Sequence, residues 1–407
     1  MSALRRLASA LVMAAAVSGC GDEARTPTAP AADPAVTAAV AAVYTQVVVG
    51  GQHSCAIASN GQTYCWGKGP LGNATVSISS TPVRVAGNLR FVQISAGTDH
   101  TCGVTAENRA YCWGDNFLGQ VGDGTHFNAR NTPVAVGGGR LFRHIRAGGN
   151  HTCAINPFNK VFCWGDNSHS QLGDGTSLQR LLPTRVAGDL TIRRMIAGWQ
   201  HTCAVTTGGK GYCWGRNDEG QLGTGNRTGS LKPVAVSGGL SFSQVVAGSN
   251  HTCGVTTLNK GYCWGAIADD YNGQLGTGGF AGSTVPVAVA GTRQWRQVNA
   301  GFLHTCGVTQ ANVAFCWGFG WYGQNGDGTQ EIVVRSPVRV AGNLPFVGVA
   351  VGVGDPRLLG PSGYAVHTCG ITTDGRVFCW GWGSGGRLGN GTSGTGSLTP
   401  VQALPPT

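Results

Sequence analysis

The chain has 407 residues, of which 68 are glycine and only 11% are Asp, Glu, Lys or Arg; about 25% is typical of soluble domains. The sequence has few Glu and Lys residues but many Val, Thr, Gly and Trp residues. This composition excludes a mainly helical protein and indicates an all-β fold rich in turns. The net charge of +10 includes no run of basic residues longer than two. This excludes a nucleic-acid-binding stripe and indicates a mild preference for acidic partners.

The first 20 residues have the pattern of a secretory signal peptide. Arg5 and Arg6 supply a positive start, and residues 7–16 form an apolar stretch too short to span a membrane. The stretch ends in Val17-Ser18-Gly19-Cys20, which resembles a bacterial lipobox, in which the cysteine is acylated and becomes the new N-terminus. We therefore predict a lipoprotein of the bacterial cell envelope, anchored to the membrane outside the cytoplasm through Cys20, in the periplasm or at the cell surface. An ordinary signal peptide with a coincidental cysteine is the alternative.

Residues 21–43 are rich in Ala, Pro and Thr, a composition that cannot bury a core. We expect this stretch to be a tether that separates the signal peptide, residues 1–20, from one folded domain, residues 44–407.

From residue 44 onward one pattern recurs seven times, with a period of roughly 50 residues. Each copy contains His-x-Cys, nine further residues and then Cys-Trp-Gly, and each predicts four short strands, named a, b, c and d. In the second copy they are Phe91–Ala96, His100–Thr105, Arg109–Trp113 and Pro133–Val136. Seven such units predict an all-β, seven-bladed β-propeller of four-stranded antiparallel blades, with a ring closed by the N- and C-terminal strands.

Fourteen of the 15 cysteines fall into seven equally spaced pairs, and the remaining one is Cys20. In an exported protein such pairs predict disulfides, each joining strands b and c of one copy. The predicted pairs are Cys55 with Cys65, Cys102 with Cys112, Cys153 with Cys163, Cys203 with Cys213, Cys253 with Cys263, Cys306 with Cys316, and Cys369 with Cys379. Zinc binding by the His-x-Cys motif is the alternative, but each copy lacks a fourth ligand. We expect no metal or other cofactor, and we expect the repeated His to donate to a neighbouring backbone carbonyl.

The units AG-x-x-HTCAVT, VYCWG-x-N-x-x-GQLGDGT and PV resemble the regulator of chromosome condensation repeat, in particular its bacterial form, in which hairpin cysteines are common. The resemblance covers residues 44–404 and implies a seven-bladed propeller that binds another macromolecule. One eukaryotic member of the family is a nucleotide exchange factor for a small GTPase, and a secreted bacterial member inhibits β-lactamases. The fold alone therefore selects no activity, and the expected export disfavours nucleotide exchange.

In such a blade the a–b and c–d connections emerge at the same end, and loops on a rigid scaffold concentrate binding residues. Trp199 and Phe302 stand in a–b connections where other copies have small or polar residues. We expect both to be exposed partner-binding anchors; packing onto neighbouring loops is the alternative. The candidate binding residues of this end are Trp199, Gln200, Phe302, Leu303, Asp99, Asn150, Asn250, Trp321, Tyr322, Asp270, Tyr271 and Tyr364.

The sequence lacks a nucleophile elbow and a phosphate-binding loop, and the repeated Asp-Gly-Thr segments at Asp123, Asp174 and Asp327 are typical of turns. We therefore predict no catalytic residues and a monomer that binds a protein or glycan partner. The alternative is a propeller hydrolase or lyase acting on envelope glycans, with a carboxylate pair among Asp99, Asp269 and Asp270.

Overall fold

A computed structural model describes residues 43–267, 272–354, 367–394 and 396–406. The chain divides into the units Met1–Val40 and Ala41–Thr407, and every described strand belongs to the second unit. Within the described residues the chain forms seven separate four-stranded antiparallel sheets, each built from four consecutive strands. The all-β, seven-bladed prediction is therefore confirmed.

The strands of the seven blades follow one another in chain order. Blade 1 comprises β1 (Tyr44–Val49), β2 (His53–Ala58), β3 (Thr63–Lys68) and β4 (Ile78–Arg84); blade 2 comprises β5 (Phe91–Ala96), β6 (His100–Thr105), β7 (Ala110–Gly114) and β8 (Arg130–Ala135). Blade 3 comprises β9 (His144–Ala147), β10 (His151–Ile155), β11 (Val161–Gly165) and β12 (Arg180–Arg185); blade 4 comprises β13 (Ile192–Ala197), β14 (His201–Thr206), β15 (Gly211–Gly215) and β16 (Ser230–Ala235). Blade 5 comprises β17 (Phe242–Ala247), β18 (His251–Thr256), β19 (Gly261–Gly265) and β20 (Ser283–Ala288); blade 6 comprises β21 (Trp295–Ala300), β22 (His304–Thr309), β23 (Ala314–Phe319) and β24 (Val333–Arg339). Blade 7 comprises β25 (Phe346–Val351), β26 (His367–Thr372), β27 (Val377–Trp382) and β28 (Gly396–Gln402), with a short 3₁₀ helix, η2 (Ser384–Gly386), between its last two strands.

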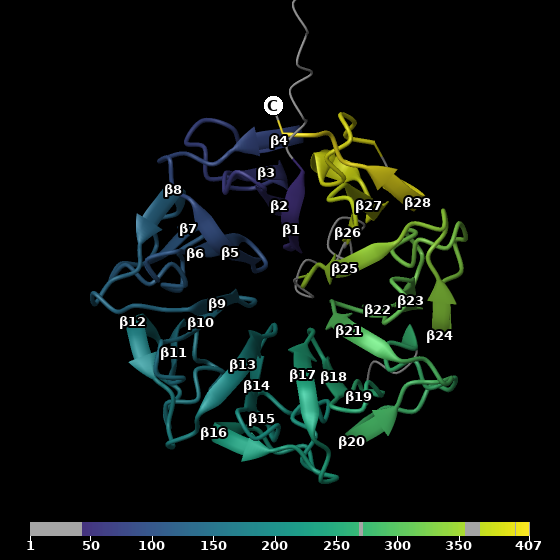
Figure 1. The fold of residues 1–407 in the computed structure, drawn as a ribbon. Coiled ribbons are helices and arrows are strands. Elements are labelled where there is room, and N and C mark those ends of the chain that lie inside the picture. The colour runs from purple at the N-terminus through teal and green to yellow at the C-terminus, as the bar shows by residue number, and fades with distance from the viewer. Residues whose placement is uncertain (1–42, 268–271, 355–366, 395, 407) are drawn as a thin grey trace, which may run out of the picture. The chain divides into compact units, whose positions relative to one another are not determined.

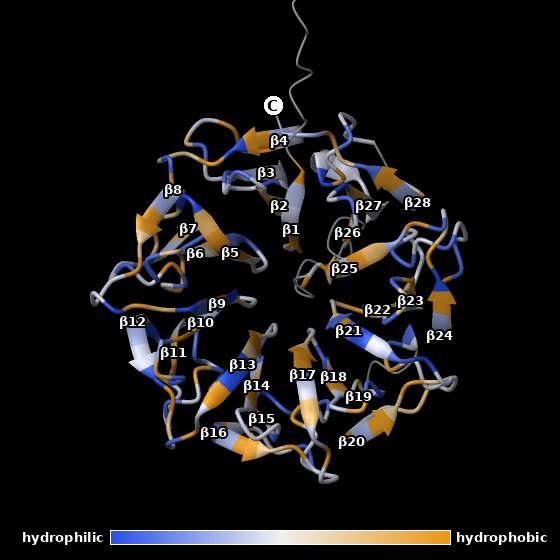
Figure 2. Ribbon diagram, viewed as in Figure 1, coloured by the Kyte–Doolittle hydropathy of each residue, from blue (hydrophilic) through white to orange (hydrophobic). Residues whose placement is uncertain are grey.

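The blades are arranged as a ring around a central channel (Figure 1). Strand a of each blade, for example β1 or β5, lies innermost, and strand d lies at the rim. The inner strands β17 and β25 are largely apolar, whereas β9 and parts of β13 and β21 are hydrophilic (Figure 2). The channel wall therefore combines apolar and polar strands.

The predicted hairpins are present in every blade. Strands b and c pair so that the two cysteines of each copy lie directly opposite each other, as Cys203 and Cys213 do with Cα atoms 4.1 Å apart. All seven pairs are joined as disulfides in the structure, and the side chains of the paired cysteines are fully buried.

The observed pairing agrees with the predicted pairing in every blade. The bonds join Cys55 to Cys65, Cys102 to Cys112, Cys153 to Cys163, Cys203 to Cys213, Cys253 to Cys263, Cys306 to Cys316, and Cys369 to Cys379. Each disulfide fixes a b–c hairpin inside the blade that contains it. A cysteine in such a bond is not a free thiolate, so the zinc alternative has no support in these residues.

The hydrophobic core lies between adjacent blades. One buried cluster joins Cys253 and Val255 of blade 5 to Trp295 and Trp317 of blade 6, and comparable clusters occupy the neighbouring interfaces. In six of the seven blades an aromatic residue at or just before the start of strand a packs on the Trp of strand c, with ring centroids 5.5 Å apart for Trp295 and Trp317; blade 4 has Ile192 instead. The repeated Trp is therefore the central packing residue of each blade.

The ring closes where blade 1 meets blade 7, as expected. The amide of Tyr44 donates to the carbonyl of Gly375 at 2.9 Å, and its hydroxyl donates to the carbonyl of Leu404 at 3.2 Å. The indole of Trp66 donates to the carbonyl of Arg387 at 3.0 Å. β1 pairs with β2 and β28 pairs with β27, so the ring closes by packing of whole blades and not by exchange of a strand.

A search of the described residues finds no helix with the length and apolar character needed to cross a membrane.

Candidate partner-binding face

We call the end of the ring that carries the a–b and c–d connections the loop face. Backbone hydrogen bonds join the a–b turn of each of the first six blades to the turn of the next blade: Thr98 donates to Gly148 at 3.1 Å and Trp199 donates to Gly248 at 3.1 Å, and equivalent bonds start from Gly51, Gly149, Ser249 and Phe302. The turn must contain glycine, because a Cβ at Gly97 would lie 2.2 Å from the carbonyl oxygen of Gly148. These bonds hold the loops of neighbouring blades at a fixed spacing.

The repeated histidines form a closed circle of hydrogen bonds that runs from blade to blade. Each His Nε2 contacts the hydroxyl of the Thr that follows the next blade's His, as His151 contacts Thr202 at 2.8 Å. The last link joins His367 to Ser54 of blade 1 at 2.6 Å. The other five links are His53–Thr101, His100–Thr152, His201–Thr252, His251–Thr305 and His304–Thr368.

The hydrogen bonds of the hydroxyls define the protonation state of these histidines. Thr202 donates its own proton to the carbonyl of Gln171 at 2.8 Å, so it accepts a proton from Nε2 of His151. The acceptor predicted for the repeated His, a backbone carbonyl, is therefore wrong: the hydroxyl lies between the ring and that carbonyl. Burial lowers the pKa of His201 to about 3 and that of His151 to about 4, so these rings stay neutral at ordinary pH.

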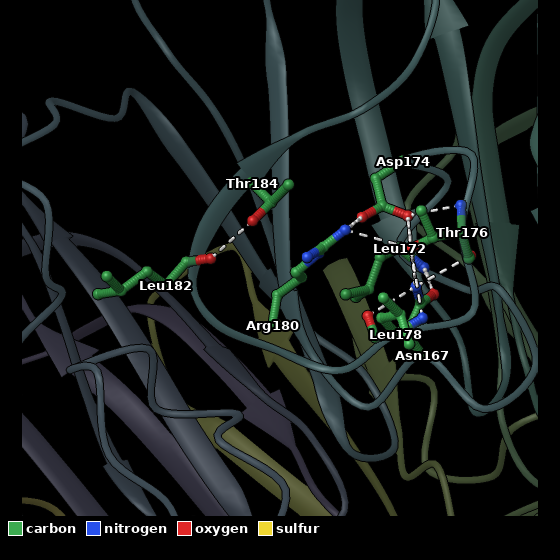
Figure 3. A network of polar contacts seen from close by, with 8 residues as sticks. All are labelled: Asn167, Leu172, Asp174, Thr176, Leu178, Arg180, Leu182 and Thr184. Carbon is green, nitrogen blue, oxygen red and sulfur yellow. Dashed lines mark hydrogen bonds and ion pairs between the residues drawn. The ribbon is translucent and has the colours of Figure 1, made fainter.

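The c–d loops are held rigid by polar contacts, which Figure 3 shows for blade 3. Asp174 accepts hydrogen bonds from the amide and hydroxyl of Thr176 at 2.9 and 2.7 Å, and from Arg180 at 2.8 Å. Asn167 donates to the carbonyls of Thr176 and Leu178. Burial raises the pKa of the Asp174 carboxyl, but the bonds from Thr176 and Arg180 outweigh burial and hold it below its ordinary value. Asp174 is therefore a turn former, as predicted.

The second residue of each predicted a–b pair has a backbone role. The carbonyls of Asp99, Asn150 and Asn250 accept hydrogen bonds from the first residues of the c–d loops, at 2.8, 2.9 and 2.8 Å. The side chains of Asp99 and Asn150 are partly exposed, whereas Asn250 is buried. This position links the two kinds of loop through its backbone carbonyl.

The predicted exposure of Trp199 and Phe302 is wrong. Trp199 is only 7% exposed: it packs on the turn of blade 3, where a Cβ at Gly149 would lie 2.7 Å from its ring, and Arg216 covers it at 5.7 Å. Arg216 also donates to Gln200 at 3.2 Å. Phe302 is 2% exposed and forms a buried cluster with Leu303.

Phe302 and Leu303 form the base of a larger group, which we call the aromatic cluster. Phe319 packs against them, Tyr322 lies 6.3 Å from Phe319, and Trp382 of blade 7 lies 4.6 Å from Tyr322. Tyr322 and Trp382 are partly buried, while the adjacent Trp321 is 51% exposed. The structure thus brings three of the predicted residues together, Phe302, Leu303 and Tyr322, and Trp321 precedes Tyr322 in the chain.

Sequence reasoning missed Phe319, which stands directly after the Cys-Trp-Gly motif where the first five copies have Lys, Asp, Arg or Ala. That departure from the repeat was a usable signal. It also missed Phe127, which is 62% exposed and packs edge-on against Phe117 at 4.8 Å on the c–d loop of blade 2. The candidate binding residues Asp270, Tyr271 and Tyr364, and the predicted lipidation site Cys20, lie outside the described residues.

A group of three or more His, Cys, Asp or Glu that could hold a metal ion is not found among the residues that the structure describes. The ring, its hairpin disulfides and its rigid loop face together define a disulfide-linked β-propeller with a surface suited to macromolecular contact.

The chain belongs to the RCC1-like domain family, whose model matches residues 14–278. The model of the regulator of chromosome condensation (RCC1) repeat matches residues 362–387 in addition. The predicted resemblance to this repeat is therefore confirmed.

Individual relatives share shorter segments. The chain is 33% identical over 113 residues to the mouse secretion-regulating guanine nucleotide exchange factor, which is 26% of this chain and 24% of the relative. It is 31% identical over 125 residues to the human E3 ubiquitin-protein ligase HERC2, which is 30% of this chain and 2% of the relative. The chain thus spans a quarter or less of these two relatives.

Solved structures share the fold over most of the chain. Human WBSCR16 aligns with a TM-score of 0.70 and 19% identity, covering 81% of this chain and 85% of that one. Yeast RCC1 (Prp20), solved bound to Kap60, aligns with a TM-score of 0.65 and 21% identity, covering 75% of this chain and 78% of that one. These likenesses establish the propeller architecture.

Proposed function

We propose that this chain is a lipid-anchored propeller of the bacterial cell envelope that binds a protein partner through its loop face, with Trp321 as the main anchor. The observation that carries the proposal is the exposure of Trp321, 51%, beside the partly buried Tyr322 and Trp382. An exposed Trp has few rotatable bonds, so it loses little conformational entropy on binding, and it is a frequent hot-spot residue.

The family supports binding as the role of the propeller. Among the relatives are an exchange factor and a ubiquitin ligase, and Prp20 was solved in complex with Kap60. Each of these names implies contact with another protein. In this chain the blade loops are fixed by backbone and Asp–Arg contacts, which suits a preformed binding surface. We propose binding without catalysis.

Export and anchoring rest on the sequence of the first 20 residues and on the disulfides. Seven disulfides call for an oxidising compartment outside the cytoplasm. If Cys20 carries the lipid, Cys20→Ser moves the chain from the membrane fraction to the soluble fraction of broken cells, while Ser18→Ala does not. A Cys20→Ser chain that stays in the membrane fraction contradicts the anchor.

The binding proposal is tested by affinity capture with the oxidised chain as bait and solubilised envelope proteins as prey. Trp321→Ala should lower retention of the specific partner at least about tenfold, a typical hot-spot loss. The matched control is Phe158→Ala, which removes an aromatic side chain that is 79% exposed on the b–c turn at the opposite end of the ring. Equal retention by both variants would exclude Trp321 as the anchor, and retention of glycans alone would replace the protein partner.

A further inference from the structure

The central channel contains an open cavity of about 710 Å³ whose wall is formed by the inner strands of all seven blades. Apolar side chains of Val, Ile and Ala cover much of this wall, together with several Gln and Asn residues. Its charged groups all lie on blades 3 and 4: Arg143, His144, Arg146, Arg193 and Arg194. None of the described residues that line the cavity is Asp or Glu.

A glutamine in strand a normally joins neighbouring inner strands. Gln46 of β1 donates to the carbonyl of Ile94 at 2.9 Å and accepts from the amide of the same residue at 3.0 Å. Gln93 makes the same pair of contacts with Ile145 on β9, and Gln297 donates to Val349 on β25. This glutamine satisfies inner-edge backbone groups that would otherwise face the channel.

Blades 3, 4 and 7 lack this glutamine, and blade 7 has Gly348 in its place. At the same position, four residues before the turn glycine, blades 3 and 4 carry His144 and Arg194. Two residues further along β9 stands Arg146, where blades 1 and 5 have Val48 and Val246. The blade itself does not need these three side chains, because blades without them have the same fold.

The three groups lie close enough to repel one another. Burial lowers the pKa of Arg146 to about 10, with the guanidinium of Arg194 contributing, and burial together with Arg146, Arg143 and Arg194 lowers the pKa of His144 to about 4. Arg143 and Arg193 differ, because each donates to backbone carbonyls of the next blade.

Arg146 and Arg194 have few partners. Arg146 donates to the carbonyl of its neighbour Ile145 at 3.2 Å, and no ion pair with either arginine is found in the part of the chain that the structure describes. Arg194 is exposed to the channel and Arg146 is partly exposed. A channel wall that gathers cations and contains no carboxylate has a positive electrostatic potential, which attracts anions.

We propose that Arg146 and Arg194, with Arg143, Arg193 and His144 around them, form an anion-binding site in the central channel that takes the phosphate groups of a small molecule. Two arginines from adjacent blades present planar, bidentate donors, which match tetrahedral oxyanions well. Several convergent cations favour a multiply charged ligand over a single carboxylate. The site is separate from the aromatic cluster of blades 6 and 7, so the channel and the loop face bind independently.

The repeat itself supplies the test variants. Arg194→Gln introduces the residue found at Gln46, Gln93, Gln244 and Gln297, and Arg146→Val introduces the residue found at Val48 and Val246. We expect the double variant to melt at the same temperature as the parent chain or higher, because it removes charge repulsion and adds a glutamine contact. Arg296→Met is the control: it removes an exposed arginine of β21 that does not line the cavity.

The measurement is calorimetric titration of the full chain with inorganic pyrophosphate, and with citrate as a polycarboxylate, at constant ionic strength. Pyrophosphate should bind the parent chain and the Arg296→Met control alike, bind the double variant at least about tenfold more weakly, and raise the melting temperature only where it binds. Unchanged pyrophosphate affinity in the double variant, or no binding to the parent chain, overturns the site. Tighter binding of citrate than of pyrophosphate overturns the phosphate assignment.

Discussion

At the scale of single residues, the repeated His and the following Thr or Ser join each blade to the next. Each histidine is buried and neutral. Its Nε2 donates to a hydroxyl of the next blade, and in most links that hydroxyl donates in turn to a backbone carbonyl, as Thr202 does to Gln171. The sequence showed that this His recurs and is structural in character. Its partner could not be predicted, because that partner belongs to the next copy and is reached only through the ring.

This arrangement predicts loss of stability in acid. The unfolded chain takes up protons on these histidines below about pH 6.5, whereas burial lowers the pKa of His100, His251 and His304 in the folded ring to about 3. The free energy of unfolding should therefore be constant above pH 7 and fall between about pH 6.5 and 4, by up to about 1.4 kcal/mol per pH unit for each histidine. Denaturant unfolding at a series of pH values measures this slope.

A variant provides the control for the acid dependence. His201→Gln removes one of the titrating groups, so its slope between pH 6.5 and 4 should be shallower than that of the parent chain, whatever its stability at pH 7. A stability that is independent of pH over this interval would show that the histidines are accessible to protons in the folded ring.

Burial of Trp199 and Phe302 marks the limit of reasoning from single residues. Both stand at positions that tolerate small side chains, which correctly showed that the blade does not require them. Whether such a side chain faces solvent depends on what the c–d loop of the same or the next blade places over it. Arg216 covers Trp199 and Phe319 packs against Phe302, and neither contact follows from the repeat pattern.

At the scale of elements, strands a and b of the second copy were predicted with the bounds that the structure shows, Phe91–Ala96 and His100–Thr105. Strand c begins one residue later than predicted, at Ala110, and strand d begins three residues earlier, at Arg130. The a and b strands are fixed by buried residues at regular spacing. Strand d lies at the rim and is only partly buried, so its apolar pattern is weak.

The b–c hairpin depends on its disulfide to a degree that can be measured. Cys203 and Cys213 are ten residues apart and fully buried, and closing a loop of this size contributes up to about 3 kcal/mol. We expect Cys203→Ala with Cys213→Ala to lower the free energy of unfolding by about 1–3 kcal/mol, because the sheet already restrains the hairpin. Urea unfolding under oxidising conditions tests this, and titration with a thiol reagent in denaturant should detect no free thiol among the fourteen paired cysteines of the parent chain.

At the scale of the whole molecule, the two proposed binding sites lie on different blades of a ring of seven nearly equivalent units. The channel wall departs from the repeat at blades 3 and 4, where cations replace glutamine and valine. The loop face departs from it at blades 6 and 7, where aromatic residues gather. The number of blades and the loop face could be predicted from the sequence. The channel site could not, because the residues that form it are brought together only when the ring closes.

The central claim is that a protein partner contacts the loop face at blades 6 and 7. The most direct measurement places a photo-crosslinking amino acid at position 321 in one chain and at position 158 in another, in intact cells that express the full chain. We predict a crosslinked protein species from position 321 and none from position 158, which lies at the opposite end of the ring. The same species from position 158, or none from position 321, would contradict the claim.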